Sequence, residues 1–210
     1  TVFSGWGTTN DLRIKPEVVA NGLQVFSCSN ASNTSYATLS GTSMSCPFAT
    51  GCSILIQEFC QKYLSYFPKS STAKGCIIHG ADFYEIPNDA NVSGKHGYGI
   101  INMNNTLKFL DEVYKNTDGY ALYNNEVMTN DDTEKIYTFD NGDAFKSLVV
   151  TLCWTDVPGV GNDTFSIQQP DDKSIINRLG LYIEHTNTQG QSDRKSTRLN
   201  SSHLVISYAV

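Results

Sequence analysis

One short segment of the sequence has the composition of a nucleophile site. It reads Gly-Thr-Ser-Met-Ser-Cys-Pro over residues 41–47, and a long apolar stretch follows it directly. A serine in the first turn of a helix has its N–H among the unpaired donors at the positive end of the helix dipole, where an oxyanion binds well. The small neighbours Gly41 and Ser45 let a substrate backbone approach closely. The segment therefore predicts a nucleophilic Ser43 beside an oxyanion site.

A helix over residues 43–67 must position this serine. Its apolar residues fall on every side of a helical projection, which predicts a helix buried in a domain core. Thr42 or Ser43 can cap its start, Pro47 falls in the first turn or so, and Pro68 follows its end. A purely structural alternative is that Thr42 and Ser43 only cap a core helix.

Further elements flank this helix on both sides. Apolar residues at helical spacing predict helices over residues 71–82 and 103–114. Two short strands are expected before the first helix, at residues 18–19 and 23–26, separated by a break at Asn21-Gly22. This half of the chain is therefore expected to be mixed α/β.

The character of the sequence changes after Asn116. Short segments rich in Tyr, Asn and Asp follow, without a helical period, and residues 116–119 are the expected junction. Strand-like segments occur at 135–139, 146–154 and 179–184. We therefore expect a separate all-β module, a sandwich.

The serine segment resembles the serine motif of the subtilisin-like (subtilase) serine peptidases. That motif is Gly-Thr-Ser-Met-Ala/Ser-x-Pro followed by a small residue, an apolar residue and Gly, and residues 48–51 fit the continuation. Two residues depart from the family pattern. Asn21 stands in place of Pro, and Cys46, read as a buried small hydrophobe or half of a disulfide, stands in place of a small non-thiol residue. The resemblance covers about residues 1–114 and includes the segments 3–7, 12–22, 36–40, 74–81 and 97–102.

The resemblance implies an Asp/His/Ser endopeptidase that acts on protein or peptide substrates. Ser43 would attack the scissile carbonyl, a histidine would take its proton, and an aspartate would orient the histidine. In this family the aspartate, the histidine and an oxyanion-hole asparagine precede the serine, whereas His79 and His96 follow it. We therefore expect those three residues outside this sequence and the chain as given to be inactive. The remaining motif residues assigned to the site are Gly41, Thr42, Met44 and Pro47.

Two other functional readings are weighed against this one. The α/β-hydrolase elbow, Gly-x-Ser-x-Gly, fails because Ser45 occupies the position of the second glycine. The other alternative is an inactive subtilase relative that acts as a binding or processing module through its β-sandwich. The intact serine motif at 41–47 argues against loss of the catalytic nucleophile.

The second module also resembles a known unit. Residues 148–159 and 175–183 look like the β-sandwich that follows the catalytic domain in many subtilases, with Arg178 and Gly180 replacing two aspartates of that pattern. Residues 140–143, Asp-Asn-Gly-Asp, offer oxygens suited to Ca²⁺ or form a solvated turn. No cofactor is required for the chemistry, and the sequence is compatible with a structural calcium ion.

The last eighteen residues, 193–210, have an abrupt Ser/Arg-rich composition without an apolar period. Residues 193–203 read as a translated sequencing adapter, and the alternative is a natural basic tail. We exclude 193–210 from the fold as an artefact. The expected division is then residues 1–116 as the C-terminal part of a three-layer subtilisin-like domain, 117–192 as a jelly-roll-like β-sandwich, and the tail.

Composition excludes several classes of protein. The chain has 210 residues, of which 40% are hydrophobic and 17% charged, as in an ordinary globular protein. A net charge of −6 without a basic stripe argues against a nucleic-acid partner, and no apolar run is long enough to span a membrane. The chain starts at Thr1 without a leader, so a longer parent protein is expected. Five Asn-x-Ser/Thr triplets before residue 193, at Asn30, Asn33, Asn91, Asn104 and Asn162, favour a secreted or lumenal protein.

Overall fold

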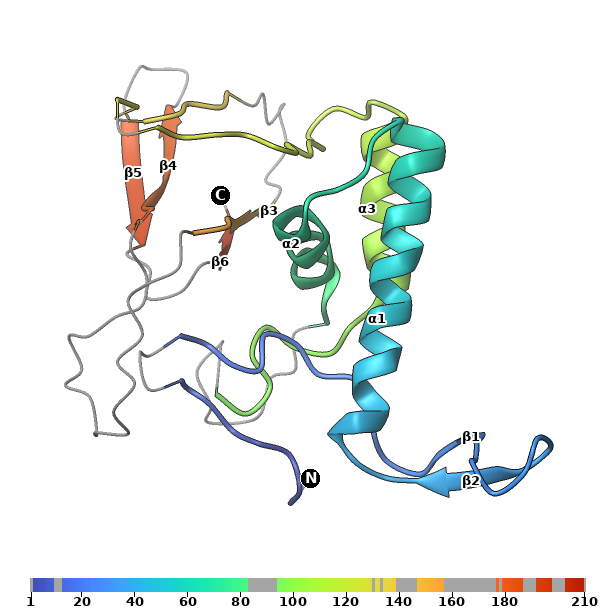
Figure 1. Ribbon diagram of the computed structural model, residues 1–210. Helices are drawn as coiled ribbons and strands as arrows, with labels where there is room; N and C mark the ends of the chain where they lie inside the picture. The colour runs from blue at the N-terminus through green and yellow to red at the C-terminus, as the bar shows by residue number, and fades with distance from the viewer. Residues whose placement is uncertain are drawn as a thin grey trace.

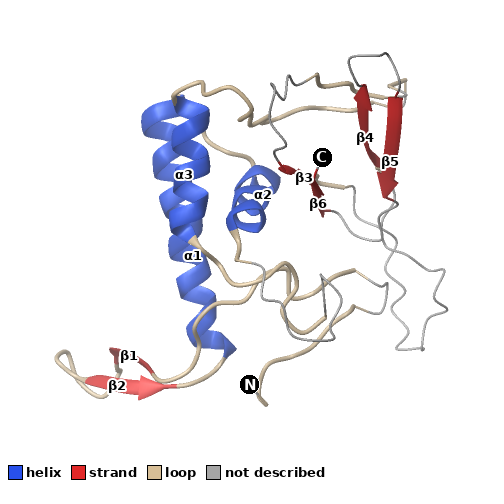
Figure 2. Ribbon diagram, turned by 180° about the vertical axis from the view of Figure 1, so that it is seen from behind, coloured by secondary structure: helices blue, strands red, loops and turns tan. Residues whose placement is uncertain are grey.

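The computed structural model describes residues 2–9, 13–82, 94–129, 131–132, 134–138, 147–156, 177, 179–186, 192–197 and 203–209. Within these residues the fold mixes helices and strands. Figures 1 and 2 show two long helices, α1 and α3, side by side, with α2 between them and the strands of the C-terminal half. A β-hairpin projects from the start of α1 (Figure 1).

The three predicted helices are present. α1 (Thr42–Phe59) continues into a π-helical turn, η1 (Cys60–Leu64), and ends where Ser65 adopts a left-handed φ of 61°. This end is three residues earlier than predicted. α2 (Ser70–Gly80) lies close to its predicted range, and α3 (Met103–Tyr114) matches its predicted bounds. Asn102 caps α3, because its side chain accepts a hydrogen bond from the N–H of Asn105.

The core forms where the three helices meet. Ile56 of α1 and Leu110 of α3 are fully buried, and α2 contributes Cys76 and Ile77. Thr106 of α3 is also fully buried, and its hydroxyl donates to the carbonyl oxygen of Asn102 at 3.1 Å. The helices therefore approach closely enough for short side chains to fill the space between them.

The expectation of a fully buried α1 is wrong. Only the side facing α2 and α3 is buried, through Cys52 and Ile56, while Phe48 is 49% exposed and Ile54 57% exposed. The apolar residues do surround the helix, but within the described residues the second side has no cover. This helix is therefore held to the rest of the molecule along one stripe.

The strands form three separate antiparallel pairs. β1 (Val25–Cys28) pairs with β2 (Tyr36–Leu39) in the hairpin before α1. β3 (Ser147–Cys153) pairs with β6 (His203–Ala209), and β4 (Leu181–Thr186) pairs with β5 (Ser192–Thr197). The predicted strand at 18–19 is reduced to a single parallel bridge between Val19 and Ile100.

Two of the three strand segments predicted after residue 116 are strands, β3 and β4. Residues 135–138 have no regular structure, and residue 139 lies outside the described residues, as do the candidate calcium ligands at 140–143. The described strands make two-stranded pairs, and no sandwich of facing sheets is formed among them.

All of strand β5 except Ser192, and all of β6, fall in residues 193–210, the tail expected to be an artefact. They pair with β4 and β3 through backbone hydrogen bonds. An open strand edge accepts almost any extended segment, because its N–H and C=O groups carry no sequence information. The pairing therefore does not test the adapter origin of residues 193–210, which stays a prediction.

Candidate active site

The start of α1 is built from the end of the hairpin. β2 ends at Leu39, Gly41 is the N-cap, and Thr42 is the first helical residue. No side chain caps this helix end, so the expectation that Thr42 or Ser43 caps it is wrong. The backbone turn takes that place, since the N–H of Met44 donates to the carbonyl of Gly41 at 3.0 Å.

Ser43 is the second residue of α1 and is exposed. It lines an open groove along the exposed side of the helix together with Cys46, Pro47, Thr50, Gly51 and Ile54. Among the described residues, no group hydrogen-bonds to its hydroxyl, and the first turn of α1 carries no acidic residue. A hydroxyl and the positive end of a helix dipole therefore face the same accessible space.

The other motif residues surround this position. Pro47 is the sixth helical residue and so lies in the second turn, not in the first. Because it has no N–H, it cannot donate to the carbonyl oxygen of Ser43. Cys46 is exposed in the groove, not buried, since nothing described covers that side of α1. Met44 is half-buried and Thr42 exposed.

A close backbone contact fixes the serine turn. The N–H of Gly41 donates to the carbonyl of Gly22 at 2.8 Å, and the hydroxyl of Ser45 donates to the carbonyl of Ala20 at 3.1 Å. A Cβ on Gly22 would lie 2.3 Å from the hydroxyl oxygen of Ser45 and 2.6 Å from the carbonyl oxygen of Gly41. Residues 20–22 therefore lock the loop that carries Ser43, and only glycine fits at position 22. Gly22 was expected as a break between strands and as part of the family-like segment 12–22, and its contact with the serine turn was not predicted.

Gly22→Ala should displace the serine turn. The added methyl meets backbone at Gly41, which has no free rotation to move away. A displacement of about 1 Å at a nucleophile reduces the rate by about 100-fold. We expect this loss in the rate of serine labelling by a fluorophosphonate, measured on the full-length product of the gene. Gly5→Ala is the matched control, because a Cβ there meets nothing within 4 Å. Equal rates in the two variants would contradict the locking role.

Neither His79 nor His96 lines the groove. The ring of His79, at the end of α2, has its Nδ1 3.0 Å from the hydroxyl of Thr151 and packs against Phe109. Burial lowers the pKa of His79. His96 is buried in the turn before Gly97. These two positions give Ser43 no base among the described residues.

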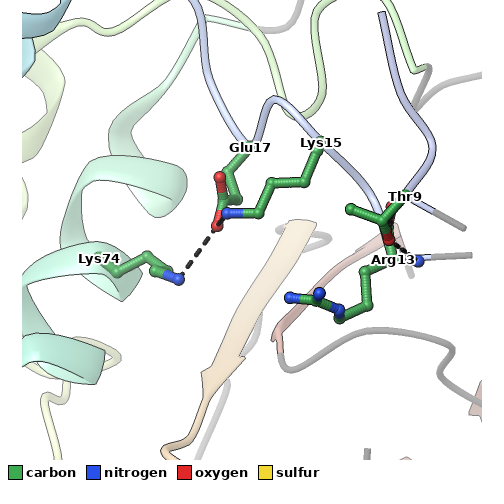
Figure 3. Close-up of polar contacts among 5 residues, drawn as sticks. All are labelled: Thr9, Arg13, Lys15, Glu17 and Lys74. Atoms are coloured by element: carbon green, nitrogen blue, oxygen red, sulfur yellow. Dashed lines mark hydrogen bonds and ion pairs between the residues drawn. The ribbon is translucent and has the colours of Figure 1, made fainter. Parts of the chain in front are cut away.

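A half-buried carboxylate anchors the segment that leads to residues 20–22. Figure 3 shows Glu17 between Lys15 and Lys74, and its Oε1 lies 3.0 Å from the ammonium of Lys74 on α2 and in contact with that of Lys15. Burial raises the pKa of Glu17, but the hydrogen bonds and charges of the two lysines outweigh it and lower the pKa from 4.5 to about 2. Sequence analysis missed this contact, because nothing in the sequence pairs Lys74 with a residue 57 positions away.

The backbone of Glu17 is held by a turn that the sequence did single out. The N–H of Tyr98 donates to the Glu17 carbonyl at 2.7 Å. Gly97 has a φ of +58°, and a Cβ there would lie 2.2 Å from that carbonyl oxygen. Glycine is therefore needed at position 97 for both conformation and space.

Glu17 should make stability depend on acid pH. A carboxylate whose pKa is lowered on folding stabilises the folded chain above its unfolded value of about 4.5, and this contribution is lost as the pH falls toward 2. Since both lysines are over 40% exposed, we expect about 1 to 2 kcal/mol. Glu17→Gln should lower the temperature of half-inactivation at pH 7 and leave little difference from wild type near pH 2. Glu58→Gln, at an exposed glutamate of α1, is the control. A Glu17→Gln effect equal at both pH values would refute the ion-pair account.

No helix in the described part of the chain is both long and apolar enough to cross a bilayer.

A protein-family model matches the N-terminal part of this chain. Residues 1–99 match the Peptidase_S8 profile, described as Subtilase family. C5a peptidase of Streptococcus pyogenes is 42% identical over 66 residues, which are 31% of this chain and 5% of that protein. A serine protease/ABC transporter B family protein, tagA, of Dictyostelium discoideum is 20% identical over 219 aligned positions, 90% of this chain and 12% of its own.

A solved structure also resembles the chain. The Clostridium perfringens CspB protease is 29% identical, with a TM-score of 0.48, over 53% of this chain and 24% of its own. The chain spans 5% to 12% of the curated relatives cited above. With the serine motif and its locked turn in the matching segment, residues 1–99 are similar to the subtilase family of serine peptidases.

Proposed function

We propose that this chain is part of a serine endopeptidase that hydrolyses peptide bonds through an acyl-enzyme on Ser43. The observation that carries the proposal is the place of Ser43, exposed in an open groove at the first turn of α1 within a subtilase segment. Its hydroxyl would attack the scissile carbonyl, and its own N–H would donate to the oxyanion that forms. No cofactor is needed for these steps.

The base, the orienting acid and the side-chain donor of the oxyanion hole belong to the same proposal. We place them in chain that precedes residue 1 in the full-length gene product, in the order aspartate, histidine, serine. The great length of the curated relatives supports this placement. The substrates would be proteins or peptides, and the relatives named as C5a peptidase and serine protease support this class.

Two further parts of the proposal concern the remainder of the molecule. We assign residues 117–192 to a β-sandwich appended to the peptidase domain, and the strands β3 and β4 support an all-β module there. We assign the parent protein to a secreted or lumenal compartment, supported by the Asn-x-Ser/Thr triplets. A structural calcium ion is compatible with the peptidase chemistry but takes no part in it.

Covalent labelling by a fluorophosphonate tests the function. The reagent should modify the full-length gene product at Ser43, and a peptide substrate should slow the modification by competition. Labelling in the wild type with none in Ser43→Ala supports the peptidase. A folded gene product that neither labels nor hydrolyses peptides supports the inactive binding module instead.

A further inference from the structure

The tip of the β1–β2 hairpin holds two adjacent acceptor motifs. They are Asn30-Ala31-Ser32 and Asn33-Thr34-Ser35, separated by no other residue. The backbone N–H of Ser29 donates to the carbonyl of Ser35 at 2.9 Å, which closes the turn. Figure 1 shows this hairpin extending beyond the start of α1, away from α2 and α3. Both motifs thus lie on one well-formed and prominent loop.

Both asparagines of the tip are exposed, and so is Ser32. The hydroxyl oxygens of Ser32 and Ser35 lie 2.6 Å apart at the surface. Asn-x-Ser in a surface loop of an exported protein is an acceptor for an N-linked oligosaccharide. The tip therefore presents the amide and the hydroxyl that the modification requires.

The third triplet within the described residues, Asn104-Asn105-Thr106, differs in this respect. Asn104 is exposed in the first turn of α3, but Thr106 is fully buried and its hydroxyl donates to the carbonyl of Asn102. Asn91 and Asn162 lie outside the described residues. Of the three described triplets, the two at the hairpin tip are the ones whose hydroxyl residue reaches the surface.

We propose that the hairpin tip is an N-glycosylation site, with an oligosaccharide on Asn30, Asn33 or both. The donor is an oligosaccharide carried on a lipid diphosphate. The asparagine amide nitrogen forms the bond to the anomeric carbon, the bond from that carbon to the diphosphate oxygen breaks, the lipid diphosphate leaves with the electron pair, and the amide loses one proton. This inference rests on one part of the proposed function, export, and not on catalysis.

The tip is well placed for such a group. The hairpin extends away from the start of α1, where Ser43 lies (Figure 1), so an oligosaccharide at the tip leaves the groove of Ser43 open. Phe26 and Tyr36 stack on the same hairpin with ring centroids 5.3 Å apart and are 69% and 60% exposed. A hydrated oligosaccharide beside them would reduce association through this apolar patch.

Peptide mapping of the full-length gene product tests the site. Trypsin cuts after Arg13 and Lys62 but not between Lys15 and Pro16, so one peptide, residues 14–62, carries both tip motifs and no other. From protein secreted by eukaryotic cells, we expect this peptide only after enzymatic removal of N-linked glycans, with aspartate at position 30, 33 or both. An unmodified 14–62 peptide in the secreted protein would overturn the site.

Two double variants complete the experiment. Asn30→Gln with Asn33→Gln, and separately Ser32→Ala with Ser35→Ala, should each give the unmodified peptide without deglycosylation. Both should keep wild-type labelling of Ser43. Loss of the glycan in the first pair but not in the second would overturn the acceptor motif. A glycosylated protein that does not label at Ser43 refutes the peptidase but keeps the site, and a protein found only in the cytosol refutes export and the site together.

Discussion

Ser43→Ala should abolish covalent labelling of the full-length gene product by a fluorophosphonate. An activated serine oxygen forms a bond to the phosphorus of the reagent and displaces fluoride, and Ser43 is the hydroxyl at the open start of α1. Peptide hydrolysis should fall by at least about 10⁴-fold, because the acyl-enzyme can no longer form. Labelling is measured by mass spectrometry of the modified peptide and hydrolysis by release of a fluorescent leaving group.

Ser53→Ala is the matched control for this variant. Ser53 lies on the same helix, and its hydroxyl donates to the carbonyl of Ala49 at 3.1 Å. It should label at the wild-type rate. Label retained in Ser43→Ala would refute the assignment of the nucleophile, and label lost from both variants would mean that the helix itself had been disrupted.

Gly80→Ala should cause a large loss of stability, because it overpacks the contact between α2 and α3. Gly80 ends α2 against α3, where a Cβ would lie 2.1 Å from the Thr106 hydroxyl oxygen and 2.7 Å from the Thr106 backbone nitrogen. Overpacking against backbone costs about 3 kcal/mol, and the better helix propensity of alanine returns about 1 kcal/mol of this. We therefore expect a net loss of about 2 kcal/mol.

The measurement is the temperature at which half of the Ser43 labelling is lost after brief heating. Gly51→Ala is the control, since Gly51 is also helical but a Cβ there meets nothing within 4 Å. This control should be as stable as wild type or slightly more so. If both variants lost activity at the same temperature, the close approach of α2 and α3 at Gly80 would not limit stability.

The helices were the most predictable part of the fold. Residues 103–114 have strong helical periodicity and a capping Asn102, and both ends of α3 were correct. The end of α1 was predicted too late, because no residue type near Ser65 indicates the left-handed turn there. The burial of α1 was overestimated. Apolar residues on all sides show that each side of a helix could be buried, but they do not show that another element covers it.

At the candidate site, the helix start was predictable and the contacts around it were not. The motif at 41–47 predicted the start of α1 to within one residue, and the catalytic role of Ser43 stays a prediction. The contacts that hold it, such as Ser45 with Ala20 and Glu17 with Lys74, join residues 25 and 57 positions apart. Periodicity and spacing report on neighbours along the chain, so such long-range contacts need the structure.

Helix α2 packs against the other two helices on one side and against strand β3 on the other. Toward α1 and α3 it contributes the core residues Cys76 and Ile77, and toward β3 its His79 meets Thr151 and its Gly75 faces the side chain of Cys153. A chimera that grafts the C-terminal strands of another subtilase onto this protein would bring foreign residues to positions 151 and 153. Such a chimera should fold only when positions 75 and 79 of α2 are replaced together with the strands. The C-terminal strands are therefore exchangeable along with the facing residues of α2, and not by joining the two chains at the junction alone.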